Sequence, residues 1–319
     1  MTRPATVPRP PRQMAGFLVT KQHRRFVEFA VRRHRYIGAC YGAPGLGKTL
    51  SARTYAAADD WDHWVHHRFA KDAVLPASLL ASRTVMYTPT VTTTARQLLN
   101  EVHFHCDLLS DDIEQTFNAD YDLLMLGTEP ASHTELLIVD EADRLKTNGL
   151  EQLRDFFDRH DIGVILIGMP GFDRQLARYP QLYSRVGFAH QYRPLDPEDI
   201  QPVLARYWQQ LHLTFDPVQA SDIDAVNTIT RITGGNFRLI ERLMSQVARV
   251  LDINQLDTIT TDVVQAARET LVVGAQQRPN SATRTCQIIR PFTALDRARR
   301  HQVWDLIETY RVQTRLDGT

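Results

Sequence analysis

The sequence predicts an α/β fold with a parallel sheet flanked by helices, followed by a small all-helical region and a C-terminal helix. Three observations predict this fold class. A glycine-rich loop, Gly42–Thr49, stands between a short apolar run and a helical segment. Two further apolar runs, 136–139 and 163–168, have the length and composition of strands buried in a parallel sheet. Residues 198–272 show only patterns that are typical of helices.

The composition is that of an ordinary soluble globular chain. The 319 residues are 43% apolar and 23% charged, and 37 basic residues balance 37 acidic ones. Nucleic-acid binding would therefore need a local basic patch, because there is no global basic field. The three cysteines, Cys40, Cys106 and Cys286, lie far apart, which argues against a disulfide framework and a zinc site. Since the sequence has neither a membrane-spanning run nor a signal-peptide core, we expect a cytoplasmic protein.

The stretch GAPGLGKT fits the phosphate-loop pattern G-x-x-x-x-G-K-[ST] at every fixed position. Glycines let backbone N–H groups approach phosphate oxygens, and the following helix points its positive end at the same oxygens. Lys48 is expected to reach the β- and γ-phosphates of ATP, and the Thr49 hydroxyl to bind Mg²⁺. The residues expected to hold the nucleotide are Gly42, Ala43, Pro44, Gly45, Leu46, Gly47, Lys48, Thr49, Leu50 and Asp140.

The apolar run Leu136–Val139 delivers Asp140 and Glu141 to the carboxyl end of a predicted strand. Ligands of open α/β sheets bind at that end. Asp140 fits the aspartate that holds Mg²⁺, and Glu141 is placed to polarise the attacking water as a general base. A strand that simply ends in an acidic turn is the structural alternative, but the complete phosphate loop earlier in the chain favours catalysis.

The chain divides into four expected parts. These are a flexible basic arm (1–15), a nucleotide-binding α/β domain (16–196), a helical lid (197–273), and a linker with a C-terminal helix (274–319). Within them we expect a basic helix over 20–34, capped by Thr20, and a helix over 93–106. Residues 107–130 give no firm prediction.

Five segments together resemble an AAA+ ATPase over roughly residues 15–272: GAPGLGKT, LLIVDEAD, VILIGMPG, LYSRVGF and TGGNFR. The pairing of GMPGF with SRV and TGGNFRLIERL resembles the bacterial transposition regulators of the TnsC, TniB and MuB kind. ExeA-like secretion ATPases share these features. The resemblance implies a P-loop AAA+ core, a small all-helical lid and a C-terminal helical tail.

The resemblance also implies roles for single residues. Lys48 and Thr49 match the Walker A pair, and Asp140 and Glu141 match the Walker B pair. The sensor position at the end of the strand before LYSRVGF reads Gly168-Met169, with no polar side chain. A backbone group could take the place of the sensor side chain. Otherwise the attacking water would be poorly positioned and ATP hydrolysis slow, which suits a timed switch better than a motor.

Two arginines match catalytic positions of the family. Arg185 resembles the arginine that reaches the γ-phosphate of the neighbouring subunit, and the alternative is a surface arginine at a helix end. Arg238 resembles the sensor arginine of the lid, which touches the γ-phosphate in its own subunit. Its alternative is an ion pair with Glu241 three residues on.

In the transposition interpretation, ATP binding assembles subunits into a ring or helical filament on double-stranded DNA. The assembly recruits a transposase, with or without a target-selection adaptor, and hydrolysis disassembles it. Candidate contacts to DNA phosphates are Arg96, Arg144 and Lys146, each of which could instead be a solvated charge. The alternatives are an ExeA-like secretion ATPase and a helicase-loading or signalling switch, both without direct DNA binding. The absence of a membrane segment and of a peptidoglycan-binding region favours the transposition interpretation.

We expect Lys48→Ala to abolish nucleotide binding and Glu141→Gln to bind ATP without hydrolysing it, which traps the ATP-bound assembly. Nucleotide-binding and ATP-turnover assays on the purified variants check both. Normal turnover by the Glu141→Gln protein would contradict the assignment of the general base.

Overall fold

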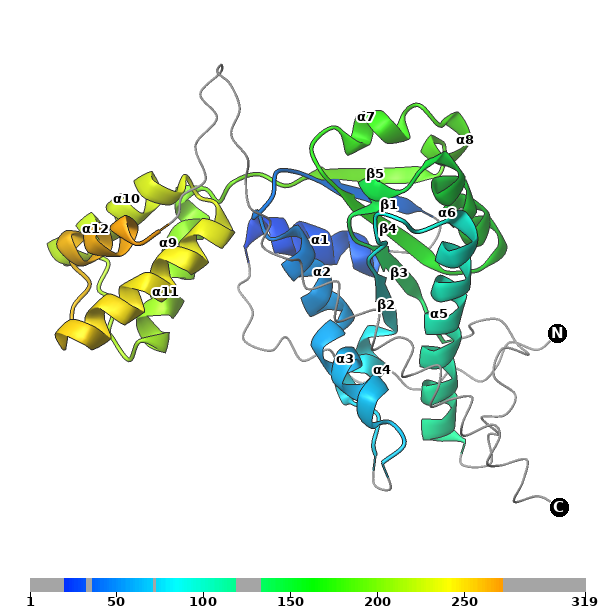
Figure 1. The fold of residues 1–319 in the computed structure, drawn as a ribbon, viewed down its shortest axis with the longest axis horizontal. Helices are drawn as coiled ribbons and strands as arrows, with labels where there is room; N and C mark the ends of the chain where they lie inside the picture. Colours follow the sequence, from blue (N-terminus) through cyan, green and yellow to red (C-terminus); the bar gives the residue numbers. More distant parts are fainter. Residues whose placement is uncertain (1–19, 33–35, 71–72, 119–132, 272–319) are drawn as a thin grey trace.

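A five-stranded parallel sheet with helices on both faces forms the centre of the protein (Figure 1). The computed structural model describes residues 20–32, 36–70, 73–118 and 133–271. The strands are β1 (Ile37–Tyr41), β2 (Thr84–Tyr87), β3 (Leu136–Val139), β4 (Gly163–Gly168) and β5 (Val186–Gln191). They lie in the order β2-β3-β4-β1-β5. The predicted α/β fold class is confirmed, whereas the predicted arm (1–15) and C-terminal helix lie outside the described residues.

All four strand pairings are parallel. Ile37 of β1 is opposite Val164 of β4, and Leu136 of β3 is opposite Gly163. Since parallel strands run in one direction, the segments that follow β1, β2, β3 and β4 meet at a single edge of the sheet. This edge, called the carboxyl edge below, is where the predicted phosphate loop and the predicted carboxylates lie.

Side chains of β3 alternate between two hydrophobic layers. Leu136 and Ile138 pack in the cluster that contains residues of α1 (Lys21–Val31) and α2 (Lys48–Ala56). Leu137 and Val139 pack in the cluster that contains residues of α5 (Ala95–Phe117) and α6 (Thr147–Arg159). Each fully buried leucine, isoleucine or valine contributes about 1.5–3 kcal/mol. The two layers therefore fix the sheet between its helices.

Two elements differ from the sequence prediction. The predicted helix over 93–106 is α5, and it continues to Phe117 because Leu109 and Ile113 extend its buried face. Thr94 begins α5 with a capping box that involves Gln97. The sequence did not predict β5. This strand alternates between exposed and partly buried positions instead of forming a continuous apolar run.

Shorter elements complete the α/β part. They are α3 (Ala58–His67), α4 (Ala77–Ser82), the 3₁₀ turn η2 (Ala142–Arg144), α7 (Phe172–Leu176) and α8 (Pro180–Tyr183). Just after α3, Arg68 forms a buried ion pair with Asp112 of α5. Trp64 of α3 donates its indole N–H to the same carboxylate at 2.7 Å. Burial raises the pKa of Asp112 to about 6, although Arg68 opposes this shift.

The prediction that residues 198–272 are helical is confirmed for the described residues up to 271. The helices are α9 (Pro197–Gln210), α10 (Ala220–Thr233), α11 (Phe237–Asn254) and α12 (Thr261–Glu269), and they bury a hydrophobic cluster of their own. The backbone N–H of Lys21 in α1 donates to Asp199 of α9 at 3.2 Å, so α1 contacts this helical group, called the lid below. The exact domain boundaries stay a prediction. Within the described parts of the chain, no helix is long and apolar enough to span a membrane.

We expect Asp112→Ala to lower the free energy of unfolding by about 3–5 kcal/mol, because it leaves the Arg68 charge buried without its partner. Urea denaturation measures the change. The control is Asp155→Ala, which breaks an exposed pair with Arg159 and should cost less than about 1 kcal/mol. Equal losses in the two variants would contradict the structural role of the buried pair.

Candidate nucleotide-binding site

The phosphate loop runs from the end of β1 into the start of α2. Gly45 and Gly47 have φ angles of 81° and 90°, in the left-handed region that favours glycine. Gly47 is the N-cap of α2, so Lys48 is the first residue of that helix. The Lys48 ammonium group is mostly buried and donates to the carbonyl oxygens of Gly42 (2.7 Å) and Ala43 (2.9 Å). The loop therefore has the strand–loop–helix geometry that the sequence predicts for a phosphate cradle.

Thr49 and Asp140 meet at the carboxyl edge, although 91 residues separate them. The Thr49 hydroxyl donates to Asp140 Oδ2 at 2.7 Å, and the Glu141 backbone N–H donates to Oδ1 at 2.9 Å. Burial raises the pKa of Asp140, while these two hydrogen bonds and the Lys48 charge lower it. The hydroxyl and carboxylate are hard oxygen ligands beside the phosphate loop, which is the donor set that Mg²⁺ prefers.

The Glu141 carboxylate is held by a positively charged side chain on the same turn. The Glu141 backbone lies in the left-handed region, with a φ angle of 53°, and its carboxylate forms an ion pair with Arg144. Burial raises the pKa of Glu141, the carboxylates of Asp140 and Asp143 raise it further, and Arg144 lowers it. Arg144 Nη1 also donates to the Pro89 carbonyl oxygen at 3.2 Å. From the sequence, Arg144 was predicted only as a DNA contact, and its ion pair with the predicted base was not predicted.

The absence of a polar side chain at position 168 has a packing reason. A Cβ atom on Gly168 would lie 2.4 Å from the ring of Phe172, so only glycine fits against this ring. The next backbone N–H, on Met169, donates to Asp143 Oδ1 at 3.1 Å. A backbone group therefore links the end of β4 to the acidic segment that follows β3.

The lid contacts the phosphate loop directly. The Arg238 backbone N–H donates to the Gly45 carbonyl oxygen at 3.0 Å, and Asn236 Nδ2 donates to the Pro44 carbonyl oxygen at 3.0 Å. Asn236 Oδ1 accepts the N–H of Leu239, so Asn236 is the N-cap of α11. The positive charge of Arg238 lowers the pKa of Lys48, although burial is the larger cause. The ion pair of Arg238 with Glu241, the alternative weighed from the sequence, is not among those formed by the described residues.

Comparison with known proteins agrees with this geometry. A model of the AAA domain family matches residues 31–176. A Staphylococcus aureus protein named "Potential ATP-binding protein" is 40% identical over 267 residues, which cover 81% of this chain and 97% of that protein. The chain belongs to the AAA family of ATPases. This membership confirms the prediction that the chain is an ATPase.

Two solved structures show the same fold as this ATPase. The RuvB Holliday junction branch migration motor of Thermotoga maritima has a TM-score of 0.52 and 17% identity, covering 82% of this chain and 72% of that chain. Cdc6p of Pyrobaculum aerophilum has a TM-score of 0.50 and 16% identity, covering 84% and 71%. At such low identities these two relatives show the fold alone.

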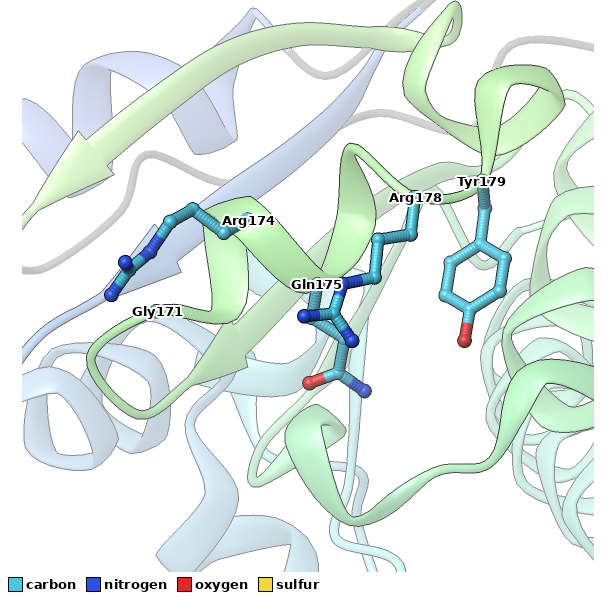
Figure 2. A pocket seen from close by; sticks show the side chains of 5 residues that line it. All are labelled: Gly171, Arg174, Gln175, Arg178 and Tyr179. Atoms are coloured by element: carbon cyan, nitrogen blue, oxygen red, sulfur yellow. The ribbon is translucent and has the colours of Figure 1, made fainter.

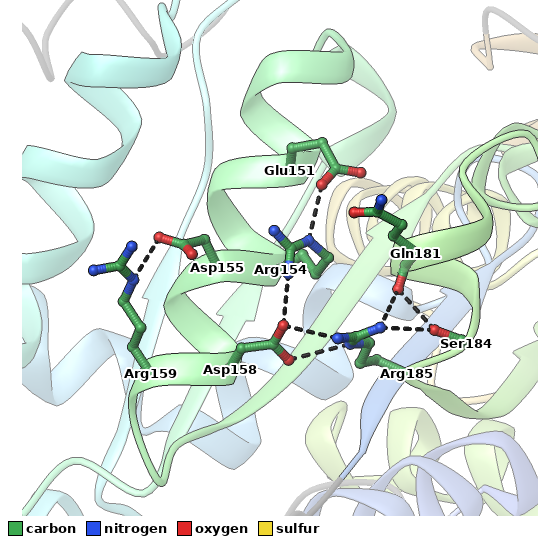
Figure 3. A network of polar contacts seen from close by, with 8 residues as sticks. All are labelled: Glu151, Arg154, Asp155, Asp158, Arg159, Gln181, Ser184 and Arg185. Carbon is green, nitrogen blue, oxygen red and sulfur yellow. Dashed lines mark hydrogen bonds and ion pairs between the residues drawn. The ribbon is translucent and has the colours of Figure 1, made fainter.

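Arg185 of this ATPase does not lie at the phosphate loop. It directly precedes β5, and its carbonyl oxygen accepts the N–H of Ile37 at the start of β1. Its guanidinium binds Asp158 of α6 and lies in a network of charged side chains (Figure 3). The structure therefore places Arg238 beside the site and Arg185 at the opposite edge of the sheet.

The three candidate DNA contacts follow adjacent strands. Arg96 is exposed in the first turn of α5, after β2, and Lys146 is exposed at the start of α6, after β3. Arg144 joins these two segments through its bond to the Pro89 carbonyl oxygen. All three lie in connections that leave the carboxyl edge.

A separate hollow of about 520 Å³ lies on α7 (Figure 2). Its lining residues are Gly171, Arg174, Gln175, Arg178 and Tyr179. The Tyr179 hydroxyl lies 2.9 Å from the Thr147 hydroxyl, so the hollow adjoins the start of α6. None of the predicted site residues lines it.

We expect Arg144→Gln to move the acid limb of the pH–rate profile for ATP turnover to higher pH. The base must be ionised to act, and removal of the Arg144 charge leaves burial and two neighbouring carboxylates to raise the pKa of Glu141. Turnover measured without DNA between about pH 5 and pH 8 tests this.

The matched control is Lys146→Gln, which removes one charge two residues away and should leave the acid limb in place. An acid limb that is unchanged or moved to lower pH in Arg144→Gln would contradict the role given to this ion pair.

Proposed function

We propose that this ATPase regulates DNA transposition: with ATP it assembles on target duplex DNA and recruits or activates a transposase, and hydrolysis disassembles it. The observation that carries the proposal is the double contact of Arg144. This side chain binds Glu141, the proposed base, and also the Pro89 carbonyl oxygen in the segment that leads to Arg96. The surface with the proposed DNA contacts is thus bonded to the proposed catalytic carboxylate.

The chemistry of ATP hydrolysis is assigned to the carboxyl edge. Lys48 would exchange its two loop carbonyls for β- and γ-phosphate oxygens, and backbone N–H groups of the loop would hold the same phosphates. Thr49 and Asp140 would hold Mg²⁺, which neutralises phosphate charge when bound. Glu141 would accept a proton from the attacking water, for which it must leave the Arg144 guanidinium.

The lid would couple ATP binding to the assembly of subunits. Asn236 and the Arg238 backbone are hydrogen-bonded to the loop carbonyls of Pro44 and Gly45. Phosphates on this loop would attract the Arg238 guanidinium, which starts from the first turn of α11. Binding of ATP would therefore change the position of the lid relative to the sheet. A lid whose position depends on nucleotide supports a homo-oligomer that forms with ATP.

Contact with DNA is proposed through phosphates rather than bases. The chain has no net charge, so a local group of cations must supply the attraction. Arg96 and Lys146 are exposed, and no ion pair with a described residue neutralises them. Contacts of this kind bind duplexes of any sequence and weaken with salt. Choice of a target would then come from the transposase or from an adaptor protein.

We expect duplex binding that requires ATP, is lost with ADP or without nucleotide, and weakens steeply as salt rises. Fluorescence anisotropy with a labelled random-sequence duplex measures affinity, and negative-stain imaging shows whether rings or filaments form. Arg96→Ala and Lys146→Ala should each lower the slope of log affinity against log salt by about 1. The control Arg159→Ala removes an exposed arginine of α6 that pairs with Asp155, and it should keep the slope.

Absence of binding at low salt in every nucleotide state would contradict the transposition proposal. The alternative function would then be an ATPase switch for protein assembly, of the ExeA-like or helicase-loading kind. Such a switch would keep nucleotide-dependent assembly without DNA.

A further inference from the structure

Arg185 is engaged by four acceptors of its own subunit. Its Nε and Nη2 atoms donate to the two carboxylate oxygens of Asp158, at 3.1 and 3.0 Å. Its Nη1 atom donates to the Gln181 carbonyl oxygen at 3.0 Å and to the Ser184 hydroxyl at 2.9 Å (Figure 3). The contact with Asp158 is a bidentate arginine–carboxylate pair, the geometry in which a guanidinium also binds a phosphate.

A second guanidinium reaches the same carboxylate. Arg154 Nη1 donates to Asp158 Oδ2 at 2.6 Å, and Arg154 Nε donates to Glu151 at 2.8 Å. The Arg185 hydrogen bonds lower the pKa of Asp158, and Arg154 adds to this shift, so the carboxylate is ionised at neutral pH. Two arginines thus converge on the Asp158 carboxylate. The same pair of guanidinium groups could bind a phosphate, and Asp158 occupies the place that the phosphate would take.

The network lies at the surface. The side chains of Arg185 and Asp158 are 36% and 29% exposed. Exposed ion pairs hold their partners weakly, because both charges are well solvated when they separate. A phosphate carries more negative charge and more acceptor oxygens than a carboxylate, so it can replace Asp158 at the two guanidinium groups.

The phosphate cannot come from the subunit's own nucleotide. Arg185 adjoins Ile37, at the amino end of β1, whereas the phosphate loop begins after Tyr41, at the other end. A five-residue strand spans about 16 Å, which is longer than an arginine side chain. A phosphate that reaches Arg185 must therefore come from outside the subunit, and the proposed assembly would bring the nucleotide of a second copy there.

We propose that Asp158 retains Arg185 within its own subunit, and that a phosphate of the nucleotide bound by a neighbouring copy displaces this carboxylate and takes both Arg185 and Arg154. The inference rests on the proposed function, in which subunits assemble with ATP, and it takes Arg185 in the role that the family resemblance implies, as the arginine that acts on the neighbouring site. Asp158 is then a positioning residue that competes with assembly. Arg154 is a second cation of the same site, which sequence analysis did not find.

A mixing experiment tests this proposal through ATP turnover. Recipient subunits carry Arg185→Ala and keep their own phosphate loop. Donor subunits carry Lys48→Ala, so they add no turnover of their own but supply Arg185 to a recipient. Donors are titrated into a fixed amount of recipients, and the donor concentration that gives half of the restored turnover is measured.

Donors that also carry Asp158→Asn should reach half-maximal restoration at a concentration about two- to fivefold lower than the parent donor. This is the factor by which loss of one exposed ion pair changes a binding equilibrium. Donors that also carry Arg154→Ala should need a higher concentration, and Arg154→Lys should recover part of the loss. The control donor carries Asp155→Asn, the same substitution on the same helix, and its carboxylate pairs with Arg159 instead of Arg185. It should behave as the parent donor does.

The outcomes separate this inference from the proposed function. Donors that restore no turnover would contradict the action of Arg185 on a neighbouring subunit. Restoration with the same half-maximal concentration for the Asp158→Asn, Asp155→Asn and parent donors would overturn the role of Asp158 alone. Loss of folded donor can only raise the concentration needed, so a lower value for Asp158→Asn supports displacement of this carboxylate.

Discussion

The hydrogen bond between the Thr49 hydroxyl and the Asp140 carboxylate is the contact on which the site depends. It joins the start of α2 to the end of β3 at 2.7 Å. The two residues meet because β1 and β3 run in the same direction on either side of β4, so the segments after them emerge at one edge. The alternating burial of Leu136–Val139 between two helical layers holds that edge in place.

Several positive charges, at the site and at the opposite edge of the sheet, are held by groups of the same subunit. Lys48 binds loop carbonyls, Arg144 binds Glu141, and Arg185 binds Asp158. Each acceptor is one that a phosphate or a rearranged neighbour can replace, since phosphate oxygens are stronger acceptors for these cations. In the proposed mechanism, exchange of these ionic partners would connect nucleotide, base and neighbouring subunit.

The sequence was sufficient for the parts of the site that consecutive residues build. The spacing of Gly42–Thr49 requires one loop geometry, and the run before Asp140 requires a strand, so Lys48, Thr49, Asp140 and Glu141 could be placed in advance. The same reasoning predicted that the lid is helical, because its apolar residues recur at helical spacing.

Contacts between distant residues could not be predicted in this way. Asn236 and Pro44 are 192 positions apart, and Arg185 and Asp158 are 27 apart, so no local pattern marks either pair. The edge strand β5 was not predicted, because alternating exposure is a weak signal in the sequence. Its packing depends on a distant residue: the ring of Phe188 lies over Gly38, where a Cβ atom would be 2.0 Å from the ring. Tertiary packing decides these features, and the sequence shows only their separate parts.

The central proposal is that a complete ATP site needs two subunits, with Arg185, which lies a strand's length from its own phosphate loop, acting on the neighbouring copy. The most direct test is ATP turnover per subunit over a wide range of protein concentration, with oligomeric state followed on the same samples. Our account predicts that turnover per subunit rises as oligomers form and levels off when assembly is complete. Full turnover per subunit in samples that contain only monomer would contradict it.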